Sequence, residues 1–190
     1  MGKNALRHKM KTDLNLIKKS IQSLIFVLPE EIDRSWLLSS YLSLRKAFLL
    51  NYERDAVARL LKVDQDNLLL KITSLTPRKT LKLVEEWVAG YYFNNAMFRM
   101  VALAETGLKV LYQKKTSRKA PKGNRAYYIL LGWYKKNYGL NLDIITEARI
   151  QINVFKHDVR SPERSKKFET MREGVEAFKE LLLLLAQICS

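Results

Sequence analysis

The chain has 190 residues, of which 47% are hydrophobic and only a few are glycine or proline, so it suits one folded domain, or one domain with an appendage, and leaves little room for disorder. Its 34 basic and 19 acidic residues give a formal net charge of +15, which predicts an anionic partner, most simply nucleic acid. The single cysteine, Cys189, excludes a disulfide framework and a cysteine-ligated zinc site, and it is typical of a cytoplasmic protein.

Apolar runs are short throughout the chain. The longest strongly apolar runs, at 24–28 and 181–186, fall far below the roughly 20 residues of a transmembrane helix. We therefore expect no membrane insertion. Basic amphipathic helices also bind anionic lipid, so a membrane surface remains a competing partner for the positive charge.

Two helices are predicted in the first third of the chain. Apolar residues recur at helical spacing over 14–28, and Pro29 is expected to close the first helix. The second helix is expected to start at Pro29 or Glu30, where acidic residues suit a first turn, and its pattern can be followed to 61. A polar break at 64–67 comes after it.

A long helix is predicted from Pro77 to about Tyr112, because Thr76 and Pro77 form a helix start signal and Gly90 is expected to mark only a bend. Six apolar residues in it repeat at three- and four-residue spacing and indicate a core face: Phe93, Met97, Met100, Ala104, Leu108 and Leu111. Four polar residues interrupt the apolar pattern: Asn94, Asn95, Arg99 and Glu105. They are typical either of a solvent-facing surface or of a functional cleft.

The segment 114–125 is the clearest loop, with one proline, one glycine and no acidic residue. Its six cations are Lys114, Lys115, Arg118, Lys119, Lys122 and Arg125. A block of like charges is either a solvated connector or, more often, an interaction segment. We expect these six side chains to bind RNA.

Four aromatic residues follow this loop: Tyr127, Tyr128, Trp133 and Tyr134. Aromatic rings beside cations can stack on bases. However, Tyr127, Leu130, Leu131 and Tyr134 are spaced as a helical stripe, which favours core packing for most of these rings.

The remaining chain is predicted to be helical as well. Gly139 fits the position after the end of a helix, Asp143 is expected to cap the next helix, and a last helix follows a polar loop at 158–164. No repeat, long heptad run or strand alternation is evident. We therefore predict an all-α bundle of about five or six helices in a single domain over 1–190, with an N-terminal helix at 1–29 and the bundle at 30–188.

The segment 147–158 carries the most informative pattern. On a helix with about 100° per residue, four polar residues fall within a sector of roughly 100°: Arg149, Asn153, Lys156 and His157. The opposite side is apolar, with Ile145, Ala148, Ile152 and Phe155. Two cations, an amide and an imidazole suit a phosphodiester, because they neutralise charge and transfer protons near neutral pH. The alternative is a solvated face whose histidine interacts with the end of the helix.

These residues resemble the active-site region of the HEPN superfamily, small all-helical domains of which many are RNases. The family pattern is an arginine and a histidine separated by four to six residues, and Arg149 with Asn153-x-x-Lys156-His157 is similar to it, although seven residues separate Arg149 from His157. The segment 91–105 resembles the long helix of these domains, in which aromatics precede a polar patch and a glutamate follows. The resemblance places Asn94, Asn95, Arg99 and Glu105 around a cleft that faces His157.

The resemblance implies a metal-independent endoribonuclease that needs no cofactor and in which the ribose 2′-hydroxyl attacks the neighbouring phosphate. His157 would act as general base or acid, Arg149 and Lys156 would stabilise the phosphorus centre, and Asn153 would hold the imidazole or a phosphate oxygen. Such domains form homodimers that bring two motifs together, and they serve as toxins beside a nucleotidyltransferase-type antitoxin or as antiviral-defence effectors.

Two other functions remain open from the residues alone. One is a non-catalytic HEPN-like module that binds nucleic acid or nucleotide, or assists a nucleotidyltransferase partner, which the long spacing between Arg149 and His157 favours. The other is a helical adaptor that binds anionic lipid or protein through its basic loop.

Overall fold

The computed structural model describes residues 2–52, 77–123, 125–157 and 167–190, and it leaves the side chains at 3, 77–87, 153–157 and 167–170 undescribed. Within these residues the chain forms six helices and no strand, which confirms the predicted all-α bundle. The helices are α1 (Lys3–Leu24), α2 (Arg34–Tyr52), α5 (Pro77–Thr116), α6 (Ala126–Tyr138), α7 (Asp143–His157) and α8 (Lys167–Cys189).

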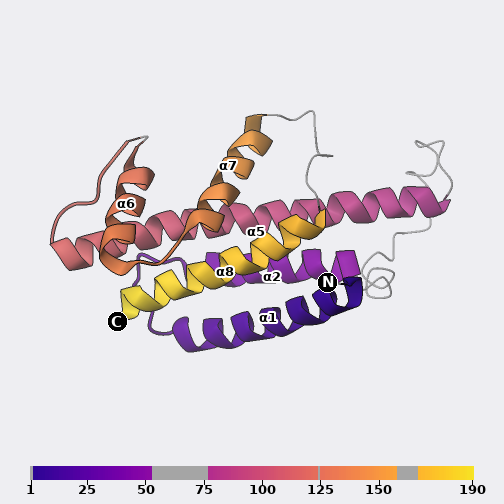
Figure 1. The fold of residues 1–190 in the computed structure, drawn as a ribbon, viewed down its shortest axis with the longest axis horizontal. Coiled ribbons are helices and arrows are strands. Elements are labelled where there is room, and N and C mark those ends of the chain that lie inside the picture. Colours follow the sequence, from indigo (N-terminus) through magenta and orange to yellow (C-terminus); the bar gives the residue numbers. More distant parts are fainter. Residues whose placement is uncertain (1, 53–76, 124, 158–166) are drawn as a thin grey trace.

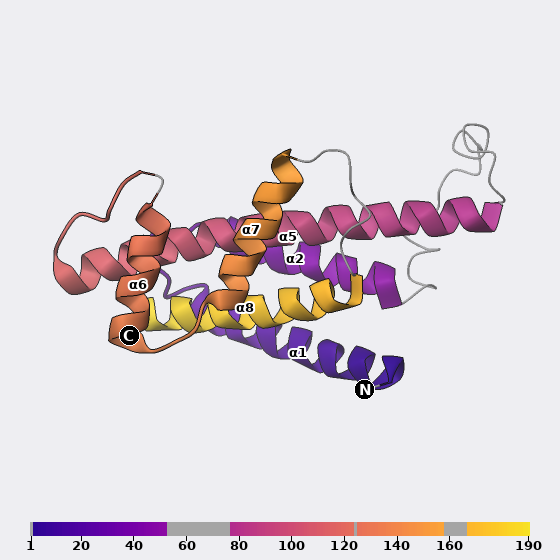
Figure 2. The same cartoon turned by 45° about the horizontal axis from the view of Figure 1, so that its top comes forward.

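The long helix α5 is the axis of the molecule. Helix α2 packs along α5, α8 packs against both α5 and α1, and these four helices run side by side (Figure 1). Helices α6 and α7 instead stand across α5, and the turned view in Figure 2 shows the same crossing. The loop between α5 and α6 therefore lies at one end of the bundle, away from α1.

One apolar core joins all six helices, and it includes all six residues predicted from the stripe on α5. Each large side chain buried in this way contributes about 1.5–3 kcal/mol relative to its exposed form. Helix α1 is further tied to α8 because the buried carboxylate of Asp13 accepts a charge-assisted hydrogen bond from Lys179, with 2.9 Å between Oδ1 and Nζ. The N-terminal helix thus shares the core of the bundle.

The boundary between α1 and α2 differs from the prediction. Helix α1 ends at Leu24, before Pro29 is reached, and α2 begins only at Arg34. The carboxylate of Asp33 caps α2 by accepting hydrogen bonds from the backbone N–H of Ser35 at 2.8 Å and of Trp36 at 3.2 Å. This cap, rather than Glu30, determines where the second helix starts. The predicted continuation of the pattern to 61 lies outside the described residues.

Helix α5 begins at Pro77 as predicted and continues to Thr116, four residues beyond the expected end. It runs through Gly90 without a break in the helix. At about 1.5 Å per residue, a helix of 40 residues is roughly 60 Å long. This length lets α5 contact α2, α6, α7 and α8 in turn.

The short connection between α6 and α7 is built by polar or flexible residues. Gly139 follows α6 in the left-handed conformation, with φ of 69°, as its position in the sequence predicted. Asp143 does not cap α7, because it is the first helical residue and its backbone N–H is bonded to the side chain of Asn141 at 3.0 Å. The carboxylate of Asp143 instead pairs with Lys135 on α6.

None of the helices in the described ranges combines the length and the apolar character that crossing a bilayer requires.

Candidate nucleic-acid interface

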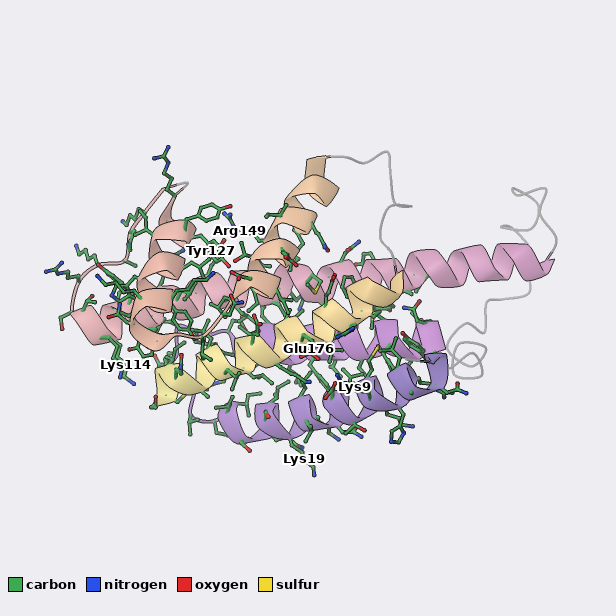
Figure 3. The ribbon with its side chains drawn as sticks, viewed as in Figure 1. Lys9, Lys19, Lys114, Tyr127, Arg149 and Glu176 are labelled. Carbon is green, nitrogen blue, oxygen red and sulfur yellow. The ribbon has the colours of Figure 1, made fainter. Side chains whose placement is uncertain are left out.

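Arg149 connects α7 to both α5 and α6. Its Nε donates to Oε1 of Glu105 on α5 at 2.9 Å, and its guanidinium lies over the rings of Tyr127 and Tyr128, with Cζ 4.8 and 5.4 Å from the two ring centres. Figure 3 shows Arg149 and Tyr127 beside each other between the crossing helices α6 and α7. The side chains of Arg149 and Glu105 are only 22% and 32% exposed, so this ion pair is partly shielded from solvent.

Tyr127 is the buried member of this cluster. Its hydroxyl is hydrogen-bonded to Oγ1 of Thr146 on α7 at 3.1 Å, and burial raises its pKa above the ordinary value of a tyrosine. The hydroxyl therefore stays protonated near neutral pH and serves as a packing and hydrogen-bonding group. The cluster holds α7 at a fixed angle to α5 and α6.

The other three predicted catalytic residues, Asn153, Lys156 and His157, have side chains that lie outside the described residues. The backbone of α7 is helical as far as His157, as the pattern predicted, and Ile145, Ala148 and Ile152 are buried. Of the four motif residues the structure thus describes one side chain, Arg149, and that side chain is bound to Glu105.

The polar residues of α5 divide between two sides of the helix. Asn95 donates to Ser43 on α2 at 3.1 Å, and Arg99 bonds to both Ser39 of α2 and Asn95. These two side chains are therefore directed to α2 rather than to the α7 side where a cleft was expected. Glu105 does face α7, and the half-buried Asn94 lies about 20° from it around the axis of α5.

The six cations of the predicted RNA-binding loop are not equivalent. Lys114 is still part of α5, and its Nζ donates to the backbone carbonyl of Ile188 at 2.7 Å, at the carboxyl end of α8. A cation at this position stabilises the last carbonyls of a helix, so Lys114 has a structural role. The side chains of the other five are exposed: Lys115, Arg118, Lys119, Lys122 and Arg125.

The loop folds back toward α5 and borders an open hollow of about 540 Å³. Its described lining residues are Lys109, Gln113, Lys119, Ala120, Pro121, Lys122, Gly123 and Ala126. They include three lysines and no acidic residue, so the hollow carries a concentrated positive charge. Sequence reasoning missed Lys109 and Gln113, although their spacing of four residues places both on one side of α5.

In the described part of the chain, no three His, Cys, Asp or Glu side chains lie close enough together to hold a metal ion.

Fold and site together define an all-α protein with a lysine-lined hollow at one end of a long central helix. No protein-family model, no curated protein and no solved structure matches the chain.

Proposed function

We propose that this protein binds RNA through the lysine-lined hollow between α5 and the loop that precedes α6. The observation that carries this proposal is the lining itself, in which Lys109, Lys119 and Lys122 come together without an acidic residue among the described groups. Three lysines that line one open hollow attract a polyanion, because each neutralised phosphate releases condensed counterions to the solvent. The net charge of +15 adds a long-range attraction of the same sign.

The size of the hollow agrees with this partner. The hollow is open to solvent and has a volume of about 540 Å³, so a phosphate with its sugar can approach the lining lysines from outside. Lysine ammonium groups are point charges with three donors each, which suits phosphate oxygens without requiring a particular base. We therefore expect binding with little sequence preference.

The experiment that tests this proposal is a titration of fluorescently labelled RNA at fixed salt. Replacing Lys109, Lys119 and Lys122 together with glutamine should weaken binding about tenfold to hundredfold. The matched control replaces Lys9, Lys18 and Lys19, which are exposed on α1, with glutamine and removes the same total charge. Equal losses in both variants would mean that net charge alone attracts RNA, and no binding by the unmodified protein would refute the proposal.

A second function, metal-independent endoribonuclease of the HEPN type, is favoured by one contact. The ion pair between Arg149 and Glu105 joins the two segments whose residues resemble the HEPN superfamily. In this proposal Glu105 orients Arg149, while His157 transfers protons and Lys156 and Asn153 assist it. A homodimer would supply the second histidine. If His157 performs no chemistry, the same arrangement serves a binding module without catalysis.

A further inference from the structure

Tyr128 is the exposed aromatic ring of α6. Its side chain is 52% exposed, whereas Tyr127 and Tyr134, which lie about 100° and 120° from it around the axis of the same helix, are 4% and 0% exposed. Trp133 is half-buried, because its ring packs against Tyr112 at 5.1 Å and Tyr138 at 5.7 Å between ring centres. Among the aromatic residues that follow the basic loop, Tyr128 thus offers the largest surface to a ligand.

The ring of Tyr128 is held in place by two neighbours. The ring of Tyr127 meets it edge-on, with 5.7 Å between centres and 77° between planes, and the guanidinium of Arg149 lies 5.4 Å from its centre. Arg149 is itself fixed by Glu105. A ring that is already fixed loses little conformational freedom when a ligand stacks on it, so it is a favourable platform for a base.

Tyr128 lies near the end of α6 that borders the hollow. Ala126, the first residue of α6, lines the hollow, and Tyr128 follows two residues later, about 3 Å further along the axis and on roughly the opposite side of the helix. The exposed Arg125 stands at the start of α6 between them. A ligand that reaches both the hollow and Tyr128 must therefore pass around the amino end of α6, beside Arg125.

This path can be followed by a single-stranded nucleic acid but not by a duplex. A duplex is stiff over roughly 150 base pairs and keeps its bases stacked inside, so it cannot turn around the end of one helix and present a base to Tyr128. A single strand is flexible and exposes its base faces, which stack on aromatic rings while the backbone follows the cations.

We propose that the bound RNA is single-stranded. Its backbone passes from the lysine-lined hollow over Arg125, and one of its bases stacks on Tyr128. This inference rests on the proposed RNA binding and adds the kind of RNA that is bound and the residue that contacts its base. Lys109, Lys119, Lys122 and Arg125 contact phosphate, and Tyr128 contacts a base.

The test measures three RNA probes: a single-stranded oligouridine of about 12 residues, an abasic strand of the same length and a duplex of the same length. The unmodified protein should prefer the oligouridine. Tyr128→Ala should weaken oligouridine binding about fivefold to hundredfold, leave the abasic strand unchanged, and keep the salt dependence. Tyr91→Ala is the matched control, because Tyr91 is 68% exposed on α5 and far from the loop in sequence.

Tyr128→Trp keeps a stacking surface and should retain the affinity for oligouridine, which also shows that the position tolerates substitution. Far-ultraviolet circular dichroism checks that each variant is folded.

Failure of the unmodified protein to bind any probe would overturn both the proposed function and this inference. Binding that is equal for oligouridine and duplex, or equal in Tyr128→Ala and Tyr91→Ala, would overturn this inference alone and leave RNA binding by the hollow intact. A loss of self-association in Tyr128→Ala without a loss of RNA affinity would assign the ring to contacts between copies of the chain, and would also overturn it.

Discussion

The guanidinium of Arg149 on α7 is joined to the carboxylate of Glu105 on α5, with 2.9 Å between Nε and Oε1. Forty-four residues separate the two along the chain, and α6 lies between them in sequence. The pair is partly shielded from solvent and the guanidinium also covers two tyrosine rings, so it fixes the position of α7 more firmly than an exposed pair would.

We predict that Arg149→Ala lowers the free energy of unfolding by about 1–2 kcal/mol, because it removes the ion pair and the ring contacts and leaves Glu105 without its partner. Arg149→Lys should recover only part of this loss, since an ammonium lacks the planar group that lies over Tyr127 and Tyr128. Urea unfolding of Arg149→Ala, Glu105→Ala and the double variant measures the coupling, which we expect to be about 0.5–2 kcal/mol. A coupling near zero would show that the two side chains do not interact in solution.

Glu180 on α8 predicts a dependence of stability on pH. Burial, with repulsion from Asp143 and Glu176, raises the pKa of Glu180 from 4.5 to about 7, and its Oε2 has no hydrogen-bond partner among the described residues. Between about pH 4.5 and 7 the folded protein therefore holds more protons than the unfolded chain, so stability falls as pH rises through this window.

Glu180→Gln should remove this part of the pH dependence and raise the free energy of unfolding at pH 8 by about 1–2 kcal/mol, since one pKa unit corresponds to about 1.4 kcal/mol and the site is partly solvated. Thermal unfolding of both proteins from pH 4 to 8 provides the comparison. If the two stability curves stay parallel over the whole range, Glu180 does not titrate in this way.

Gly174 on α8 is required by close packing. A Cβ at this position would lie 2.6 Å from Cε2 of the Phe93 ring and 3.3 Å from Cδ1 of Leu44, and an aromatic ring in a packed core cannot easily move aside. We predict that Gly174→Ala destabilises the fold by about 1–3 kcal/mol. Gly132→Ala is the control within helix α6, because nothing lies within 4 Å there, and it should stabilise by about 0.5–1 kcal/mol. Denaturant midpoints that shift alike in both variants would contradict this packing.

The ribonuclease proposal makes its own prediction. His157→Ala should abolish cleavage of RNA in the presence of EDTA, because loss of a proton-transfer group typically lowers a rate by about 10²–10⁴-fold. The products should end in 2′,3′-cyclic phosphate, which mass spectrometry of the fragments detects. Activity that requires Mg²⁺, or that acts equally on DNA, would exclude this mechanism, and RNA binding without cleavage would leave the module non-catalytic.

The helices and their core faces could be predicted from the sequence because burial imposes a period of about 3.6 residues, as in the stripe from Phe93 to Leu111. Helix boundaries were less predictable. Asp33 caps the second helix, although its start is predicted at Pro29 or Glu30, and the side chain of Asn141 accepts a hydrogen bond from the backbone at the start of α7, where Asp143 is predicted as the cap. Several short polar residues near a helix start compete, and local geometry decides between them.

The site was predictable only in part, because a polar residue on a helix does not reveal which neighbour it meets. Asn95 and Arg99 bond to serines that α2 brings against α5, and Lys109 joins the basic loop only because that loop folds back. The contact between Glu105 and Arg149 likewise depends on the angle at which α7 crosses α5. Such tertiary relations leave no signal in the local pattern of either segment.

The salt dependence of RNA binding tests the central claim most directly. The slope of log affinity against log salt concentration should fall in magnitude by about 2 when Lys109, Lys119 and Lys122 become glutamine, since each lost phosphate contact on a single strand accounts for about 0.7. The same substitutions at Lys9, Lys18 and Lys19 should leave the slope nearly unchanged. A slope that falls equally in both variants, or in neither, would contradict the assignment of the hollow as the RNA-binding site.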